Sequence, residues 1–338
     1  MKKNALKQDA YYVPEIKKLR LLLTLSAILY TFNLHPILGD FNGIIFGFSF
    51  PALYIISGYL VLREDDDIEK RILRAVKRTA ICFFVMLAVF LLLSLLVDKN
   101  TTLELIVRKR FWADVILLNI WTLPVGSTIW YVQALLYAYI IIYVIYKLKL
   151  LRFDIYIAAF CLIITLLTGE FASVIGFRFL RHPYLAGNFL TRALPYILIG
   201  CFIHRKKRLF LKLKKKHYFL IISGGAVLAF VEYMILFVTG KNIYSGHMLG
   251  MGVVAVGICL NAFFTTKMKL RSELLGGLSR HELAIPYFVC SPIYTFIIMI
   301  LKASPFTDLA NATSHFIGVL TPLLSFLVLF IYAFFAGI

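Results

Sequence analysis

The chain has 338 residues, of which 61% are hydrophobic and only 16% are charged, and its formal net charge is +19. Ordinary soluble domains carry about 25% charged residues, so this composition excludes a soluble enzyme, a disordered chain and a secreted disulfide scaffold. The sequence therefore predicts an all-α, polytopic integral membrane protein.

A helix needs about 20 mostly apolar residues to cross the hydrocarbon core of a bilayer. By that measure the sequence predicts about ten transmembrane helices. In chain order they cover residues 19–38, 41–62, 79–97, 128–147, 154–170, 189–204, 218–239, 246–266, 282–302 and 314–337. The stretch 103–123 is also apolar but carries several charges, so we expect an interfacial or re-entrant segment there.

The distribution of basic residues predicts the orientation of the bundle. With the N-terminus inside, most of the 36 Lys and Arg residues fall in cytoplasmic segments, as the positive-inside rule requires. Both termini are then cytoplasmic, with residues 1–18 as a cytoplasmic N-terminal segment. We expect one transmembrane domain over 1–338 without an appended soluble domain, in a bacterial cytoplasmic (inner) membrane. Its positive charge would face anionic lipids, and no nucleic-acid partner is expected.

The segment 63–78 between the second and third predicted spans is predicted to form a short amphipathic helix on the cytoplasmic side. Arg71 and Arg74 are three residues apart and so share one helix face. Two guanidiniums on one face can bind a phosphate in a bidentate manner, and a cytosolic acyl-CoA carries several phosphates. The same residues also fit simple anchoring to lipid headgroups.

Polar side chains inside transmembrane helices are costly and therefore mark candidate sites. Glu232 is predicted to act on substrate or a proton, or to pair with an arginine. Gln133, close to Trp130, either binds substrate or hydrogen-bonds a neighbouring helix. Arg192, at the start of the sixth helix, joins these residues in the predicted substrate-binding set. No metal site is expected.

Four stretches together resemble the membrane acyltransferase-3 family, the bacterial polytopic O-acyltransferases. They are Phe50–Leu60 with its SGYL sequence, Lys70–Arg74 with R-x-x-R spacing, Thr128–Tyr137 led by Trp130, and Leu275–Ser279. The resemblance covers nearly the whole chain. It implies that acyl-CoA is the donor co-substrate and that Arg71 and Arg74 bind its phosphates; we place Tyr59 in the same donor-binding set.

The resemblance also implies a histidine in the first helix that acts as base or acyl acceptor, at R-x10-H spacing from an arginine at the inner end of that helix. Counting from Arg20, that position holds Thr31. His35 lies four residues later on the same helix face, about 6 Å further along the axis. An imidazole can accept a hydroxyl proton at neutral pH, so we expect Arg20, Thr31 and His35 to form the catalytic set. An interfacial histidine without a catalytic role is the alternative for His35.

Three functions follow from these features. The first is an O-acyltransferase that moves an acetyl or other short acyl group from cytosolic acyl-CoA to a cell-surface glycan or lipid-linked sugar. The second, motivated by Thr31, is a member of the same fold that has lost catalysis and exports, transports or senses a glycan intermediate or small polar solute. The third is an unrelated transporter. Membrane lipids and the acceptor are the expected partners, and a homo-oligomeric assembly is left open.

Overall fold

The structure is a computed structural model in which every regular element of the described residues is a helix. It describes residues 16, 19–20, 22–30, 45–62, 67–119, 122–123, 129–168, 174, 188–239 and 249–264. Within these ranges, four helical segments are long and apolar enough to cross a membrane: Ile68–Val97, Trp130–Lys147, Leu150–Thr168 and Lys215–Val238. The all-helical membrane class is thus confirmed. The number of about ten spans stays a prediction, and the predicted helices 282–302 and 314–337 lie outside the described residues.

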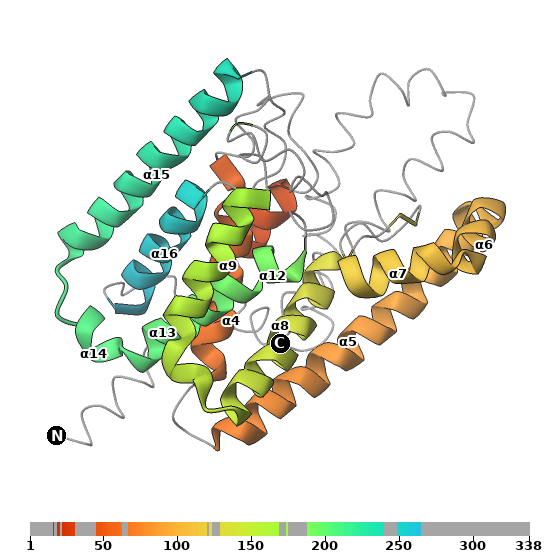
Figure 1. The fold of residues 1–338 in the computed structure, drawn as a ribbon, viewed down its shortest axis with the longest axis horizontal. Coiled ribbons are helices and arrows are strands. Elements are labelled where there is room, and N and C mark those ends of the chain that lie inside the picture. Colours follow the sequence, from red (N-terminus) through yellow and green to blue (C-terminus); the bar gives the residue numbers. More distant parts are fainter. Residues whose placement is uncertain are drawn as a thin grey trace, which may run out of the picture.

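Helix α4 (Ser49–Val61) occupies the centre of the bundle (Figure 1). Nearly all of its side chains are buried, which explains why its sequence is apolar around the whole circumference. It packs against α13 (Leu194–Arg205) and α16 (Leu249–Phe264), and α13 in turn packs against α9 (Asp154–Thr168). The apolar core therefore runs through α4 and its neighbours.

Two long helices form opposite edges of the bundle (Figure 1). Helix α15 (Lys215–Val238) packs along α16, while α5 (Ile68–Val97) packs along α8 (Trp130–Lys147). The outward sides of both edge helices carry exposed large apolar residues such as Phe84, Leu92 and Phe219. A lipid environment accounts for such surfaces, because apolar side chains gain nothing from facing water.

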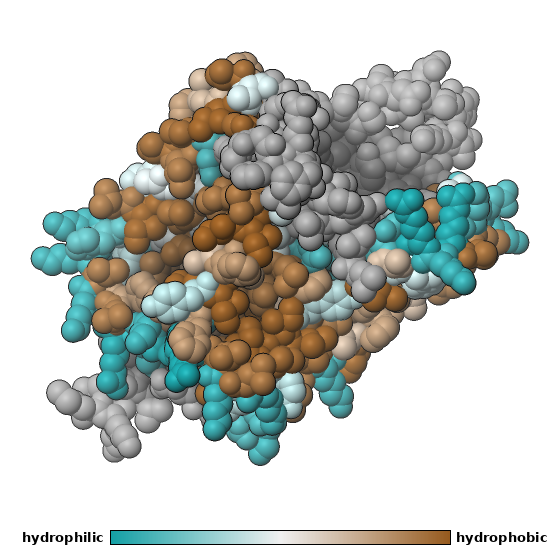
Figure 2. Space-filling view, in the orientation of Figure 1, coloured by the Kyte–Doolittle hydropathy of each residue, from teal (hydrophilic) through white to brown (hydrophobic). Residues whose placement is uncertain are grey.

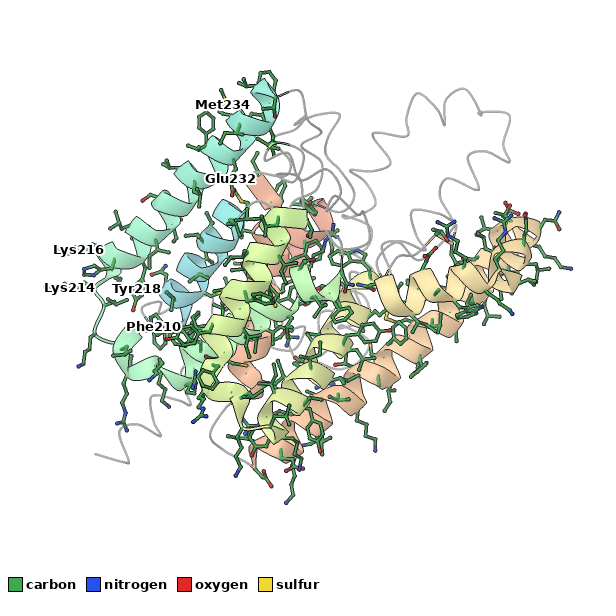
Figure 3. All side chains as sticks on the ribbon, viewed as in Figure 1. Phe210, Lys214, Lys216, Tyr218, Glu232 and Met234 are labelled. Atoms are coloured by element: carbon green, nitrogen blue, oxygen red, sulfur yellow. The ribbon has the colours of Figure 1, made fainter. Side chains whose placement is uncertain are left out.

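Figure 2 shows this pattern on the surface of the molecule. Hydrophobic residues cover the middle of the visible face, while hydrophilic residues gather at its lower and left margins and around α6 (Lys99–Val107). The labelled Lys214 and Lys216 lie at the start of α15, in the left-hand hydrophilic group (Figure 3). An apolar band between two polar margins is typical of a protein that spans a bilayer.

The start of α5 corrects the predicted division at residue 79. The sequence predicted a separate amphipathic helix in 63–78, whereas α5 runs without a break from Ile68 to Val97. Its first turn is capped by Asp67, whose carboxylate accepts a hydrogen bond from the backbone nitrogen of Glu69 at 3.0 Å. Lys, Arg and Glu are good helix formers. The charged first turns of α5 therefore remain helical, although their charges favour a position outside the hydrocarbon core.

The predicted non-spanning stretch 103–123 contains two short helices, α6 and α7 (Lys109–Leu118). Neither has the length of a transmembrane helix, which agrees with the prediction. The predicted helix 189–204 is also divided, into α12 (Phe189–Arg192) and α13. Pro195, at the start of α13, has no backbone N–H to donate to the preceding turn.

Two short helical elements, rich in basic residues, connect the longer helices. The 3-10 helix η1 (Leu150–Phe153) follows α8, with Lys149 in a left-handed conformation at a φ of 58°. Helix α14 (Lys207–Phe210) connects α13 to α15, and the fully buried Tyr218 donates a hydrogen bond to the carbonyl of Phe210 at 2.7 Å. The basic linker around α14 is thereby fixed to the bundle.

Candidate functional site

A pocket of about 530 Å³ lies where α4 ends and α5 begins, and we call it the basic pocket. Its wall includes α4, α5, α8 and the N-terminal helical segment that contains Arg20. The basic side chains that line it are Arg20, Arg71, Arg74, Lys77 and Arg78. None of the described residues that line it is acidic, so the pocket suits a ligand with several negative charges.

Helical spacing places most of these cations on one wall. Arg71, Arg74 and Arg78 follow an i, i+3, i+7 pattern on α5, which puts them along a single face. Arg20 comes from the N-terminal helical segment instead, far away in sequence. Its Nε atom is buried and has no hydrogen-bond partner among the described residues. Burying an unsatisfied charged group is costly, so an anionic ligand here would relieve that cost.

The rest of the basic pocket is neutral. Ser57 of α4 and Tyr139 of α8 line it together with apolar side chains that include Leu60 and Ile81. Ser57 is buried, and its hydroxyl donates to the carbonyl of Leu53 at 2.9 Å. A ligand with an anionic end and a less polar arm would match both parts of this lining.

A second, smaller pocket of about 50 Å³ lies further along α4, and we call it the aromatic pocket. It is lined by Tyr30, Phe50, Tyr54, Trp130 and Arg192, among others. The guanidinium of Arg192 lies 5.3 Å from the ring centre of Trp130, in a cation–π arrangement. Tyr54 and Ser57 are one helical turn apart on α4, so the two pockets are neighbours along this helix.

The structure places some of the predicted site residues together in the two pockets and others elsewhere. Arg20, Arg71 and Arg74 share the basic pocket, whereas Trp130 and Arg192 share the aromatic pocket. Thr31 and His35 lie outside the described residues.

Tyr59 is not among the residues that line either pocket. Its ring stacks on Phe263 with 4.2 Å between centres and meets the ring of His204 edge-on at 4.9 Å. These contacts join α4 to α16 and α13. They show that Tyr59 contributes to helix packing, and the donor-binding role stays a prediction from the sequence.

Gln133 and Glu232 both hydrogen-bond neighbouring helices. The amide nitrogen of Gln133 donates to the carbonyl of Val115 in α7 and to the hydroxyl of Tyr137, as one of the two sequence interpretations expected. The carboxylate of Glu232 accepts from the backbone nitrogens of Leu249 at 3.2 Å and Gly250 at 3.0 Å. These groups belong to the first turn of α16, whose N–H groups lack partners within the helix.

Sequence reasoning missed four polar residues of the basic pocket: Ser57, Lys77, Arg78 and Tyr139. The i+7 relation of Arg78 to Arg71 was a signal that the predicted helix over 63–78 already contained. Ser57 and Tyr139 carry no comparable signal, because only the packing of α4 and α8 beside α5 brings them there. In the described part of the chain, no three His, Cys, Asp or Glu residues form a group that could hold a metal ion.

Comparison with protein families gives a match to the family described as an acyltransferase domain, over residues 19–338. The chain belongs to the acyltransferase-3 family. The resemblance that the sequence motifs indicated is thus confirmed, and the protein is a membrane acyltransferase in its general class. Neither the comparison with curated proteins nor that with solved structures produced a match.

Proposed function

We propose that this member of the acyltransferase-3 family transfers an acetyl or other short acyl group from cytosolic acyl-CoA to a hydroxyl of a cell-surface glycan or lipid-linked sugar. The basic pocket is the observation that carries the proposal. Its five cations and neutral remainder match the phosphates and the pantetheine arm of an acyl-CoA. We place the protein in a bacterial inner membrane, with about ten spans and both termini in the cytoplasm.

In this proposal the acceptor hydroxyl oxygen attacks the carbonyl carbon of the thioester. The C–O bond of the new ester forms and the C–S bond breaks, so that CoA leaves as a thiolate. His35 accepts the proton of the hydroxyl and returns it to the thiolate, which balances the step. Thr31 stands where the family pattern has its histidine, and Arg20 lies at the donor pocket.

The aromatic pocket supports a place for the acceptor. Flat aromatic side chains such as Trp130 and Tyr54 offer apolar faces on which a sugar ring can lie, and Arg192 supplies hydrogen-bond donors beside them. The 50 Å³ of free space accommodates only the part of the acceptor that carries the reacting hydroxyl. Gln133 and Glu232 act at this end by fixing helices around the pocket.

The test uses purified protein in lipid nanodiscs, with labelled acetyl-CoA and cell-envelope glycan as acceptor. We expect saturable CoA binding and transfer of label to the glycan. Replacing Arg71 or Arg74 by Gln should weaken CoA binding about tenfold, because a hydrogen bond to a charged group contributes about 1.5–3 kcal/mol. Lys109→Gln, which removes a cation outside the pocket, is the matched control and should leave binding unchanged.

The His35→Ala variant separates binding from chemistry. It should bind CoA normally and transfer no label. Full transfer by this variant would remove His35 from the mechanism.

Because Thr31 replaces the expected histidine, a second candidate function is export, transport or sensing without catalysis. Uptake or release of a glycan intermediate by proteoliposomes, without any CoA binding, would select it.

A further inference from the structure

We propose that the basic pocket contains two separate phosphate subsites in a fixed order along α5. Arg71 and Arg74 bind the 3′-phosphate of the acyl-CoA donor, while Lys77 and Arg78 bind its pyrophosphate. This inference rests on the proposed function, because it takes acyl-CoA as the ligand. It adds Lys77 and Arg78 as residues that determine donor specificity.

The length of the cationic row is the first argument. All four side chains line one pocket, and α5 is an unbroken helix across them. At 1.5 Å per residue, Arg71 and Arg78 are about 10 Å apart along the helix axis. One phosphate group cannot contact both ends of such a row at hydrogen-bonding distances of about 3 Å. The row therefore suits two anionic groups held apart by a spacer.

The chemistry of CoA supplies such a pair. Its ribose carries a phosphate on the 3′ oxygen and a pyrophosphate on the 5′ oxygen, and the pantetheine arm continues from the pyrophosphate to the thioester. The order of groups along the molecule is thus 3′-phosphate, pyrophosphate and reactive end. If the thioester points into the bundle, the 3′-phosphate lies further out than the pyrophosphate.

The antiparallel packing of α5 and α8 indicates the order of the two phosphate subsites. Glu69, near the start of α5, pairs with Lys147 at the end of α8 at 2.6 Å, so the two helices run antiparallel from this end. Tyr139 is eight residues before Lys147 and therefore lies at about the level of Lys77, about 12 Å from the polar end. Ile81 lies one turn further still. Lys77 and Arg78 are therefore at the level of Tyr139 and Ile81, further inside, whereas Arg71 and Arg74 are nearer the end marked by Glu69 and Lys147.

The experiment compares CoA with dephospho-CoA, which lacks only the 3′-phosphate, by equilibrium binding to the full-length protein in nanodiscs of zwitterionic lipid. The wild-type protein should bind CoA about tenfold more tightly. In the Arg71→Gln/Arg74→Gln variant this ratio should fall to about one. In the Lys77→Gln/Arg78→Gln variant both ligands should bind about tenfold more weakly, with the ratio retained. Lys109→Gln again serves as the control.

Each outcome separates this inference from the proposed function. If the wild-type protein binds the two ligands equally, the two-subsite order is wrong while the proposed function stands. If the ratio is lost in the Lys77/Arg78 variant and kept in the Arg71/Arg74 variant, the order is reversed and the inference is overturned. If neither ligand binds, the proposed function fails as well. Repeating the titration in anionic nanodiscs shows whether lipid phosphates compete for the same cations.

Misfolding of a double variant does not remove the test. Arg74 and Lys77 are both exposed and one turn apart on α5, so Arg74→Gln and Lys77→Gln form a matched pair of single variants. Only Arg74→Gln should lower the CoA to dephospho-CoA ratio.

Discussion

The carboxylate of Glu232 on α15 accepts a hydrogen bond from the backbone nitrogen of Gly250 on α16 at 3.0 Å, and its other oxygen accepts from Leu249. An acidic side chain thus caps a neighbouring helix inside the bundle, close to where the two helices meet in Figure 3. Negative charge at a helix N-terminus is stabilised by the N–H groups that lack partners within the helix. We therefore expect Glu232 to hold α15 and α16 in register.

Glu232→Ala should lower the stability of the protein by about 1–3 kcal/mol, because it leaves buried backbone N–H groups without acceptors. Thermal unfolding in detergent measures the change. Ser223→Ala is the control, since Ser223 is exposed on the same helix and, among the described residues, donates only to the carbonyl of Leu220. A variant with normal stability and no transfer activity would instead support the substrate role predicted from the sequence.

The crossing of α4 and α13 leaves no space for a side chain at Gly200. A Cβ atom there would lie 2.1 Å from the carbonyl oxygen of Ile55, and one on Gly58 would lie 2.0 Å from that of Ile197. Gly200→Ala should therefore push the helices apart and destabilise the fold by about 1–3 kcal/mol. Gly58 belongs to the SGYL stretch, and in this chain it allows α4 to pack closely against α13.

Gly224→Ala on α15 is the matched control for this substitution. A Cβ atom at Gly224 would meet nothing within 4 Å, and alanine forms helices better than glycine by about 1 kcal/mol. Thermal unfolding should show a higher midpoint for Gly224→Ala and a lower one for Gly200→Ala. Equal midpoints for the two variants would contradict the close crossing.

Asp154 and Arg205 form an ion pair between the start of α9 and the end of α13. Asp154 is fully buried, whereas Arg205 is 29% exposed. Arg205→Ala leaves a buried carboxylate without its partner and should destabilise the protein by about 3 kcal/mol. Asp154→Asn removes the charge as well, so adding it to Arg205→Ala should restore part of the loss. A strictly additive double variant, measured by thermal unfolding, would show that the pair is not coupled.

Ionic strength should weaken donor binding if the basic pocket is the donor site. Its cations would attract the phosphates of CoA through electrostatic interactions that salt screens, with a screening length of about 10 Å at 0.1 M and about 3 Å at 1 M. We expect the Kd for CoA to rise at least several-fold over this range in wild-type protein, and less in Arg71→Gln/Arg74→Gln. An unchanged Kd would argue for binding through the neutral lining.

The sequence predicted those features that depend on local pattern. Apolar length identified α8, α9, α15 and α16. A Cβ atom on Gly250 or Gly257 of α16 would clash with α15, so the two helices pack closely at these glycines. The pairing of Arg71 with Arg74 followed from helical spacing alone.

Other features depend on how helices distant in the sequence pack together. In the sequence, Glu232 is an isolated acidic residue in an apolar stretch. Only the position of α16 shows which backbone N–H groups donate hydrogen bonds to it. Arg20 joins the α5 cations for the same reason. Tyr59 belongs to the SGYL stretch itself, and only the packing of α4 shows that its ring stacks on Phe263.

The unbroken length of α5 links the basic pocket to the thickness of the bilayer. Thirty residues extend about 45 Å, whereas the hydrocarbon core measures about 30 Å. Three turns must therefore extend beyond the acyl chains or be accommodated by tilt. A thicker membrane would draw the guanidiniums of Arg71 and Arg74 toward the headgroups, and a thinner one would lift them into the cytosol. If the basic pocket binds acyl-CoA as proposed, hydrophobic mismatch would then change the affinity for this donor.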